Sequence, residues 1–405
     1  MQLPTQFKEQ DQCKPFSVTF DELIIDDVSK GKARVSASYN RAGNCIFHLG
    51  EFFPPDFRIF DCKIELKYKE SDDPIKLLVT RRSLSSEAGE PIVEALLASA
   101  PLPLVDNSKS QRFEAVILSA PDFISNPIQL IDENGTHFEI YPPQTNDDLA
   151  CFVKSDFPLA ASNFSNPLKP LMQFLNFAKG GFCGLGNVFA YDKGDEISFR
   201  LLGFFRNDPG ERETNWFDIE VQADLPEVFL LFSTAYSDQL TRLALDQTIN
   251  FYRASNVSRR SSVELAMIAS HSALEAIVNF VLTHRAGWSK SMMNNRTIAF
   301  SDRNRAAARH LGLHAELLKE SPKLREFAAS NNDIDAFEII SRFRNKLVHQ
   351  DTKSSATGVQ LHEAWLISQW LVEVFVFGVI GYSGKIIDRR VYSGFRGTTC
   401  QIPIS

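Results

Sequence analysis

Cysteine, methionine and tryptophan are scarce in this chain, which has six Cys, five Met and four Trp among its 405 residues. The cysteines are scattered, without a CxxC pair and without the spacing of a metal site. These absences argue against a disulfide scaffold and against a zinc module. We therefore expect reduced thiols, no metal site and no cofactor.

The chain also lacks an excess of positive charge, a signal peptide and a long apolar run. Its formal net charge of −7 argues against a protein that coats nucleic acid non-specifically, but it leaves room for a local basic cleft. The N-terminus is polar, and the most apolar run, Trp370–Tyr382, is too short to span a membrane and contains Glu373. We expect a cytoplasmic protein with no membrane segment.

Two common phosphate-loop patterns are missing as well. The Gly-rich stretch Gly180–Gly186 departs from GxGxxG because Phe189 occupies the place of the last Gly, and it lacks the Lys-Ser/Thr of a P-loop. The stretch follows residues 167–178, which have the pattern of a helix. We interpret it as a helix stop followed by a turn.

Residues 15–222 have mostly the patterns of β-strands. Residues 63–69 alternate between apolar and polar, as in a half-buried antiparallel strand. Asn134-Gly135 predicts a hairpin between strands at 128–131 and 136–141. Residues 90–99 could form a short helix. Further strands are expected at 16–20, 32–38, 44–49, 57–62, 75–80, 112–118, 196–205 and 216–222.

Strand patterns stop after residue 222, where Asp224-Leu225-Pro226 is typical of a helix start. Helices are expected at 226–254, 261–284, 302–319, 333–350 and 359–382. The predicted fold class is α+β: a β-rich sandwich-like or barrel-like domain at 1–222, an all-α bundle at 223–384, and an irregular tail at 385–405.

One charged residue interrupts the apolar stripe of the helix expected at 333–350. Arg344 projects from the middle of this stripe, although a guanidinium is rarely buried without a partner. His349 follows about 140° further round the helix, and Asn345 lies on the same side as His349, where its amide could orient the imidazole. The stripe itself consists of Ile334, Phe337, Ile340, Leu347 and Val348.

The segment Arg344-Asn345-Lys346-Leu347-Val348-His349 resembles the signature of HEPN domains, in which an Arg, usually a polar residue, and three more residues precede a His. Ser272–Ile277 resembles the upstream helix of the Apea-like branch. The bare Arg-x4-His pattern is weak, since Arg305/His310 and Arg309/His314 match it too. Many HEPN proteins are metal-independent ribonucleases of toxin and abortive-infection systems. The resemblance therefore implies a helical bundle that forms a homodimer, with both motif helices lining a shared cleft.

RNA cleavage through the 2′-hydroxyl needs a base, an acid and positive charge on the phosphate. The resemblance assigns the phosphate to Arg344 and the proton transfers to His349, while Asn345 would hold the ring or touch the scissile group. The expected products carry 2′,3′-cyclic phosphate and 5′-hydroxyl ends. A phage-derived or cellular trigger could act on the β-rich domain.

Several other side chains are candidates for supporting roles. Glu264, His271 and Glu275 share one face of the 261–284 helix, so a Glu could pair with Arg344, or the face could hold an unrelated ion pair or an interface edge. His310 and His314 have zinc-helix spacing but lack the intervening Glu, which favours surface histidines. A basic groove for RNA, or merely a solvated face, is indicated by Arg285, Lys290, Arg296, Arg303, Arg305 and Arg309, with Arg342 and Lys346 beside the motif.

Two other classes of function remain open. The bundle could be a non-catalytic HEPN-type module that dimerises or binds a partner protein, with Arg344 in a structural ion pair. Alternatively, a ligand-binding β domain could stand on a dimerising stalk. Trp288 could stack on a base or lie in the core, whereas Trp365 and Trp370 are expected to pack.

Overall fold

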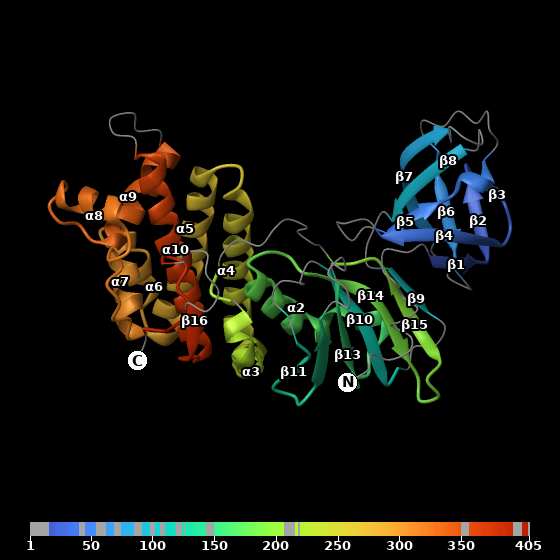
Figure 1. Cartoon of the computed structure of the whole chain (residues 1–405), viewed down its shortest axis with the longest axis horizontal. Helices are drawn as coiled ribbons and strands as arrows, with labels where there is room; N and C mark the ends of the chain where they lie inside the picture. The colour runs from blue at the N-terminus through green and yellow to red at the C-terminus, as the bar shows by residue number, and fades with distance from the viewer. Residues whose placement is uncertain are drawn as a thin grey trace. The chain divides into compact units, whose positions relative to one another are not determined.

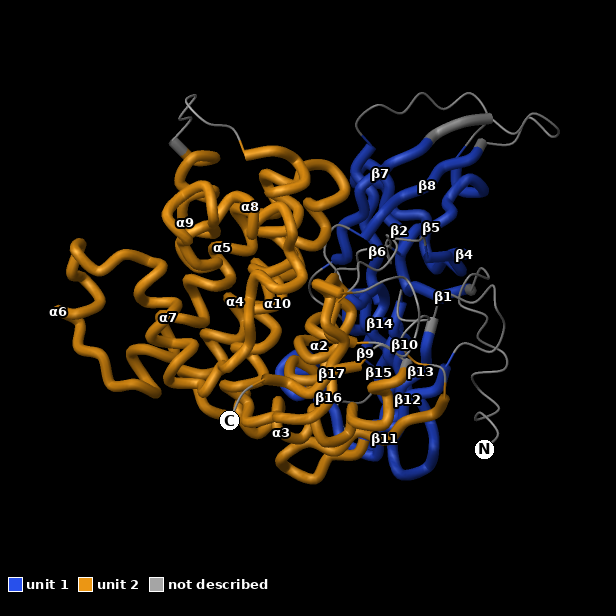
Figure 2. The backbone as a smooth tube through the Cα atoms, turned by 60° about the vertical axis from the view of Figure 1, so that its left-hand side comes forward, with its two compact units in different colours: residues 1–121, 138–167, 183–209 blue, residues 122–137, 168–182, 210–405 orange. Residues whose placement is uncertain are grey.

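A computed structural model describes most of the chain, and its residues divide into two compact units (Figures 1 and 2). Unit 1 comprises Met1–Pro121, Phe138–Pro167 and Cys183–Pro209, and unit 2 comprises Asp122–His137, Leu168–Phe182 and Gly210–Ser405. The described residues are 16–39, 45–53, 62–68, 74–84, 91–97, 102–105, 110–118, 124, 126–142, 150–205, 215–217, 219–349, 356–391 and 399–403.

Unit 1 contains a sheet of eight strands in the order β1-β4-β5-β8-β7-β6-β2-β3. Alternation builds its core: in β4, the side chains of Ala33, Val35 and Ala37 are buried while Arg34 is exposed. The strands are β1 (Phe16–Phe20), β2 (Glu22–Ile25), β3 (Val28–Ser29), β4 (Ala33–Tyr39), β5 (Cys45–His48), β6 (Ile64–Lys67), β7 (Ile75–Leu84) and β8 (Pro91–Leu97).

A second group of strands in unit 1 follows the order β12-β13-β10-β14-β15-β9. Every residue of β14 is buried, and at Gly186 a Cβ would come within 2.3 Å of the Gly203 carbonyl oxygen, so only glycine fits there. The strands are β9 (Leu102–Val105), β10 (Arg112–Leu118), β12 (His137–Tyr141), β13 (Ala150–Ser155), β14 (Gly184–Tyr191) and β15 (Ile197–Leu202).

Three expectations for the β-rich part need correction. Residues 90–99 do not form a helix, because Pro91–Leu97 is strand β8 between β5 and β7. Residues 216–222 do not form a strand, because the 3-10 helix η3 spans Ile219–Asp224. Gly180, at φ +72°, does end a helix, but β14 begins at Gly184 in place of a longer turn. The strand expected at 57–62 lies almost wholly outside the described residues.

Unit 2 is mainly helical, and its central helix is α10 (Gly358–Ile380), which packs against α3, α4, α5, α8 and α9. Almost all of α10 is buried, which explains its nearly continuous apolar sequence. The other elements are β11 (Ile128–Ile131), α2 (Ser165–Lys179), α3 (Leu225–Ser237), α4 (Gln239–Ser258), α5 (Val263–Phe280), the π-helix η4 (Val281–Arg285), α6 (Lys290–Met293), α7 (Phe300–His310), α8 (Pro322–Ala329), α9 (Ala336–His349), β16 (Lys385–Ile387) and β17 (Thr399–Gln401).

The helical expectations are right in kind but not in every boundary. The helix expected at 226–254 is two helices, because Asp238 leaves helical geometry and its carboxylate caps α4 through the Thr241 amide. The helix expected at 302–319 ends at His310, and α8 was not expected. The tail expected to be irregular at 385–405 contains the β16–β17 pair.

The fold class is α+β, with a β-rich N-terminal part and a helical C-terminal part, as expected. The two compact units interleave along the chain, unlike the single division expected at residue 222. Two stretches, Val263–Arg285 and Gly358–Ile380, are long and apolar enough to cross a membrane, but most of each is buried among other helices. This burial is compatible with a soluble protein.

Candidate functional site

Helix α9 carries the predicted motif and packs against α5, α7, α8 and α10. The Asp335 carboxylate accepts a hydrogen bond from the Glu338 amide at 2.9 Å, so the helix starts at Ala336. Its buried face includes Ile339, which was not part of the predicted stripe, whereas Val348 is 43% exposed. The helix is therefore rotated relative to the expectation, and Arg344 lies half-buried at the edge of the packed face.

The guanidinium of Arg344 contacts the side chain of the next residue. Its Nη1 donates a hydrogen bond to Asn345 Oδ1 at 3.2 Å. Among the described residues, no carboxylate lies within ion-pair distance of Arg344. The backbone of His349 ends α9, and the His349 side chain lies outside the described part. The Asn345 amide thus contacts Arg344, while its expected contact with the His349 ring lies outside the described part.

The expected support of Arg344 by an α5 carboxylate is not formed within the described part of this chain. Glu264 lies in the first turn of α5 and accepts a hydrogen bond from the Ser262 hydroxyl at 2.7 Å, which lowers the pKa of Glu264. Glu275 is exposed. The residue of that face that does lie near Arg344 is His271.

His271 is only 5% exposed on α5, and its ring lies 4.2 Å from the ring of Phe300. Burial, and then the positive charge of Arg344, lower the pKa of His271 to about 4. The imidazole is therefore neutral at neutral pH. The helical spacing placed His271 with Glu264 and Glu275, but the contact with α7 is long-range and has no signal in the sequence.

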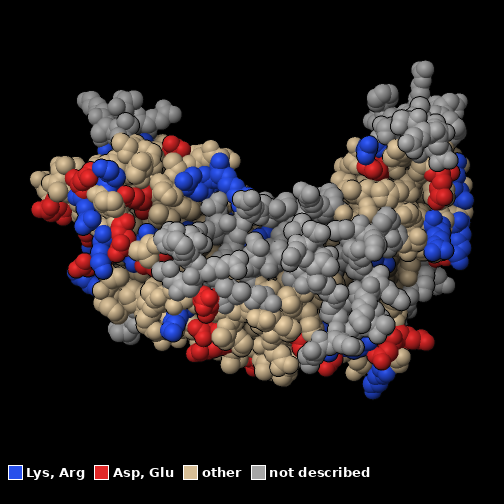
Figure 3. All heavy atoms as spheres, viewed as in Figure 1, with Lys and Arg blue, Asp and Glu red and all other residues tan. Residues whose placement is uncertain are grey.

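Ion pairs where α7 contacts the start of α9 occupy two of the predicted RNA-binding residues, Arg305 and Arg342. The Arg305 Nε lies 2.6 Å from Asp335, and its Nη1 lies 2.5 Å from Asp302. The Arg342 Nε lies 3.0 Å from Glu338. Because these charges already have partners, Arg305 and Arg342 would have to give them up to bind a phosphate. Figure 3 shows acidic and basic side chains interspersed on this side of the helical unit.

The other predicted basic residues differ in their accessibility. Arg309 is exposed, and Arg303 donates from Nη2 to the Asn295 carbonyl at 3.4 Å. Lys346 is half-buried. His310 and His314 are exposed, as expected for surface histidines, and the described residues contain no group of His, Cys, Asp and Glu suited to a metal. Trp365 and Trp370 are buried, which confirms that they pack.

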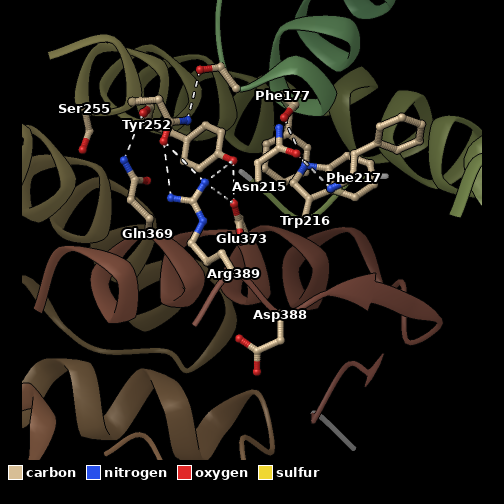
Figure 4. A network of polar contacts seen from close by, with 12 residues as sticks. Phe177, Asn215, Trp216, Phe217, Tyr252, Ser255, Gln369, Glu373, Asp388 and Arg389 are labelled. Atoms are coloured by element: carbon tan, nitrogen blue, oxygen red, sulfur yellow. Dashed lines mark hydrogen bonds and ion pairs between the residues drawn. The ribbon is translucent and has the colours of Figure 1, made fainter. Parts of the chain in front are cut away.

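A fully buried charge network was not anticipated from the sequence (Figure 4). Arg389 Nη2 lies 3.0 Å from Glu373 Oε1, and both side chains are completely inaccessible. The Tyr252 hydroxyl donates to the same Oε1 at 2.6 Å, and Arg389 Nη1 donates to Asn256 at 3.3 Å. Burial raises the pKa of Glu373 to about 7 despite the opposing effect of Arg389. The signal available in the sequence was Glu373 itself, within the most apolar run.

Comparison with known families adds one match. Residues 238–396 match the family model described as the YopA C-terminal domain. The match spans α4 to α10 and β16, so it includes the Arg344–His349 segment and the buried network, but it covers less than half of the chain. No curated protein and no solved structure matches the chain.

Proposed function

We propose that the protein is a metal-independent endoribonuclease of the HEPN type. The observation that carries this proposal is the state of Arg344. On the same helix, Arg342 is paired with a carboxylate, whereas Arg344 has none among the described residues and is held by an amide. A half-buried guanidinium without a counter-ion is suited to receive an anion such as phosphate.

The chemistry follows from the side chains of the motif. Arg344 binds the non-bridging oxygens of the phosphate and stabilises the negative charge that develops on them. Asn345 fixes the guanidinium, and His349 transfers the protons, since an ordinary imidazole titrates near neutral pH. The 2′-hydroxyl of RNA attacks the phosphorus atom, and the 5′-oxygen leaves with a proton.

The complete site is a homodimer in this proposal, because one motif supplies one histidine and the reaction has two proton transfers. The two α9 helices face each other across the axis, and the helical unit forms the interface. The enzyme acts in the cytoplasm in anti-phage or abortive-infection defence, where the β-rich unit receives a phage-derived or cellular trigger.

RNA cleavage by the full-length protein tests this function. The purified protein is incubated with a fluorescent RNA in EDTA, and products are examined for 2′,3′-cyclic phosphate ends. Arg344→Ala and His349→Ala should each abolish cleavage, and Arg344→Lys should retain only part of it because Lys cannot form the bidentate contact. Arg325→Ala, on the exposed surface of α8, is the matched control. Full activity in either motif variant rejects the assignment.

The second candidate is a non-catalytic module that binds a partner protein. The observation that favours it is the exposure of apolar side chains on α4 and α5: Leu243 and Leu265 are each 57% exposed. Expression toxicity that persists in His349→Ala but disappears in Leu243→Ser/Leu265→Ser would favour the module over the enzyme.

A further inference from the structure

Two buried polar atoms without a hydrogen-bond partner, and one arginine without a counter-ion, lie where α5, α7 and α9 meet in the described part of the chain. Nδ1 of His271 and Oγ of Ser341 are buried and have no hydrogen-bond partner in the described part of the chain. Ser341 lies one turn before Arg344, so both side chains project from the same side of α9. Arg344 has its single bond to Asn345. Buried polar groups are nearly always paired, so the two unsatisfied atoms beside this guanidinium indicate a missing ligand.

The geometry of α7 brings His271 to the Arg344 turn of α9. Arg305 contacts Asp335, and Ser301 Oγ donates to Glu338 at 2.9 Å, so earlier residues of α7 lie beside later residues of α9. Phe300 precedes Ser301 and therefore lies beside the turn that follows Glu338, which includes Ser341 and leads to Arg344. The His271 ring rests on Phe300.

The charges around this position favour an anion. Arg344 is the charged group that acts on His271 from the packed helices. The nearest carboxylate of α9, Glu338, is already bonded to Ser301 and Arg342, and the α5 carboxylates Glu264 and Glu275 are exposed. The positive charge of Arg344 disfavours protonation of the His271 imidazole. An anion bound between the two side chains would offset this repulsion and favour the protonated ring.

We propose that His271, Ser341 and Arg344 form an anion site for a phosphodiester group, and that His271 takes up one proton from solvent when the phosphate binds. Arg344 donates from its guanidinium, Ser341 from its hydroxyl, and the protonated imidazole from a ring nitrogen. The inference rests on the proposed function for the identity of the ligand as RNA. It adds a binding residue, His271, outside the Arg-x4-His motif.

Nuclear magnetic resonance of the histidine rings in the full-length protein tests proton uptake directly. The pKa of His271 is measured in the free protein, with inorganic phosphate, and with a 2′-O-methyl dinucleotide, which has no attacking hydroxyl. We expect both ligands to raise the pKa of His271 by about one unit or more. The ring signals of His310, which is exposed at the end of α7, should not respond to either ligand and serve as the internal control. An unmoved His271 overturns the proposal, and a shift with inorganic phosphate alone rejects the phosphodiester as its ligand.

Variants provide the second measurement. His271→Gln and Ser341→Ala should each weaken binding of a 2′-O-methyl oligonucleotide, His271→Gln by about tenfold, while His310→Gln leaves it unchanged. Unaltered binding by folded His271→Gln contradicts the site. The two proposals can fail separately. If the protein cleaves RNA but His271 does not respond to phosphate, the anion site is rejected and the ribonuclease proposal stands. If His271 responds but the protein cleaves no RNA, the ribonuclease proposal is rejected and the anion site stands.

Discussion

Arg389 and Glu373 form an ion pair of 3.0 Å with no solvent access to either side chain. The pair connects the turn after β16 to the middle of α10, and Tyr252 and Asn256 extend it to α4. Three segments distant in sequence are thus fixed to one another by directional contacts inside unit 2. The segment after α10 is therefore part of the helical core, where an irregular tail was expected.

Breaking this pair should destabilise unit 2 strongly. Arg389→Met leaves Glu373 buried without its counter-ion, and such a loss costs about 3–5 kcal/mol of unfolding free energy. All four Trp lie in unit 2, so tryptophan fluorescence in a urea titration reports on this unit. Glu326→Gln, which removes an exposed pair with Lys323, is the control and should change stability by about 1 kcal/mol or less. Equal effects of the two substitutions would contradict a structural role for the network.

The buried carboxyl of Glu373 should make the free energy of unfolding depend on pH. The pKa of Glu373 is raised to about 7 by burial, above its value of 4.5 in an unfolded chain. The folded state therefore binds more protons between pH 4.5 and 7, and this contribution to stability is present at low pH and is lost as the pH rises through 7. Urea titrations at several pH values should show that the unchanged protein loses stability relative to Glu373→Gln as the pH rises through 7. A difference independent of pH would show that Glu373 does not titrate there.

His271 should have the opposite dependence. Its pKa falls to about 4 in the folded protein from 6.5 unfolded, so the unfolded chain binds more protons in this interval. The contribution is present above pH 6.5 and is lost as the pH falls through 4, with a total of about 3 kcal/mol. Because it overlaps with that of Glu373, it is measured as the difference between the unchanged protein and His271→Gln. If the unchanged protein instead gained stability relative to His271→Gln on acidification, a neutral, buried His271 would be contradicted.

Local patterns predicted many elements but not those whose state depends on distant partners. Asn134-Gly135 has its own turn chemistry, and the hairpin flanks at 128–131 and 137–141 are strands. Residues 91–97 include good helix formers, yet pairing with β5 and β7 makes them a strand, in which Val93 and Ala95 are buried. Tertiary pairing outweighs helix propensities of a few tenths of a kcal/mol per residue.

The candidate site shows the same limit. The spacing of Arg344, Asn345 and His349 is visible in the sequence, because one helix carries all three. Whether Arg344 has a counter-ion depends on side chains from other helices, so the sequence could suggest Glu264 and Glu275 but could not place them. The approach of His271 depends on how α5 and α7 pack, and no local pattern encodes it.

Arg309 and Arg305 of α7 should differ in how their substitution affects RNA binding and stability. Arg309 is exposed and makes no ion pair with a described residue, so Arg309→Gln should weaken binding of 2′-O-methyl RNA and reduce the slope of affinity against salt by about one. The free energy of unfolding of Arg309→Gln should differ from that of the unchanged protein by less than about 0.5 kcal/mol.

Arg305 is held by Asp335 and Asp302 with its side chain 29% exposed, so Arg305→Gln should lower the stability of unit 2 by about 1 kcal/mol or less and leave the salt slope nearly unchanged. Binding isotherms at four salt concentrations, with urea titrations of the same two variants, distinguish the roles. A larger loss of salt dependence in Arg305→Gln than in Arg309→Gln would mean that the α7–α9 ion pairs open when RNA binds, and that the guanidinium of Arg305 exchanges its carboxylates for phosphate.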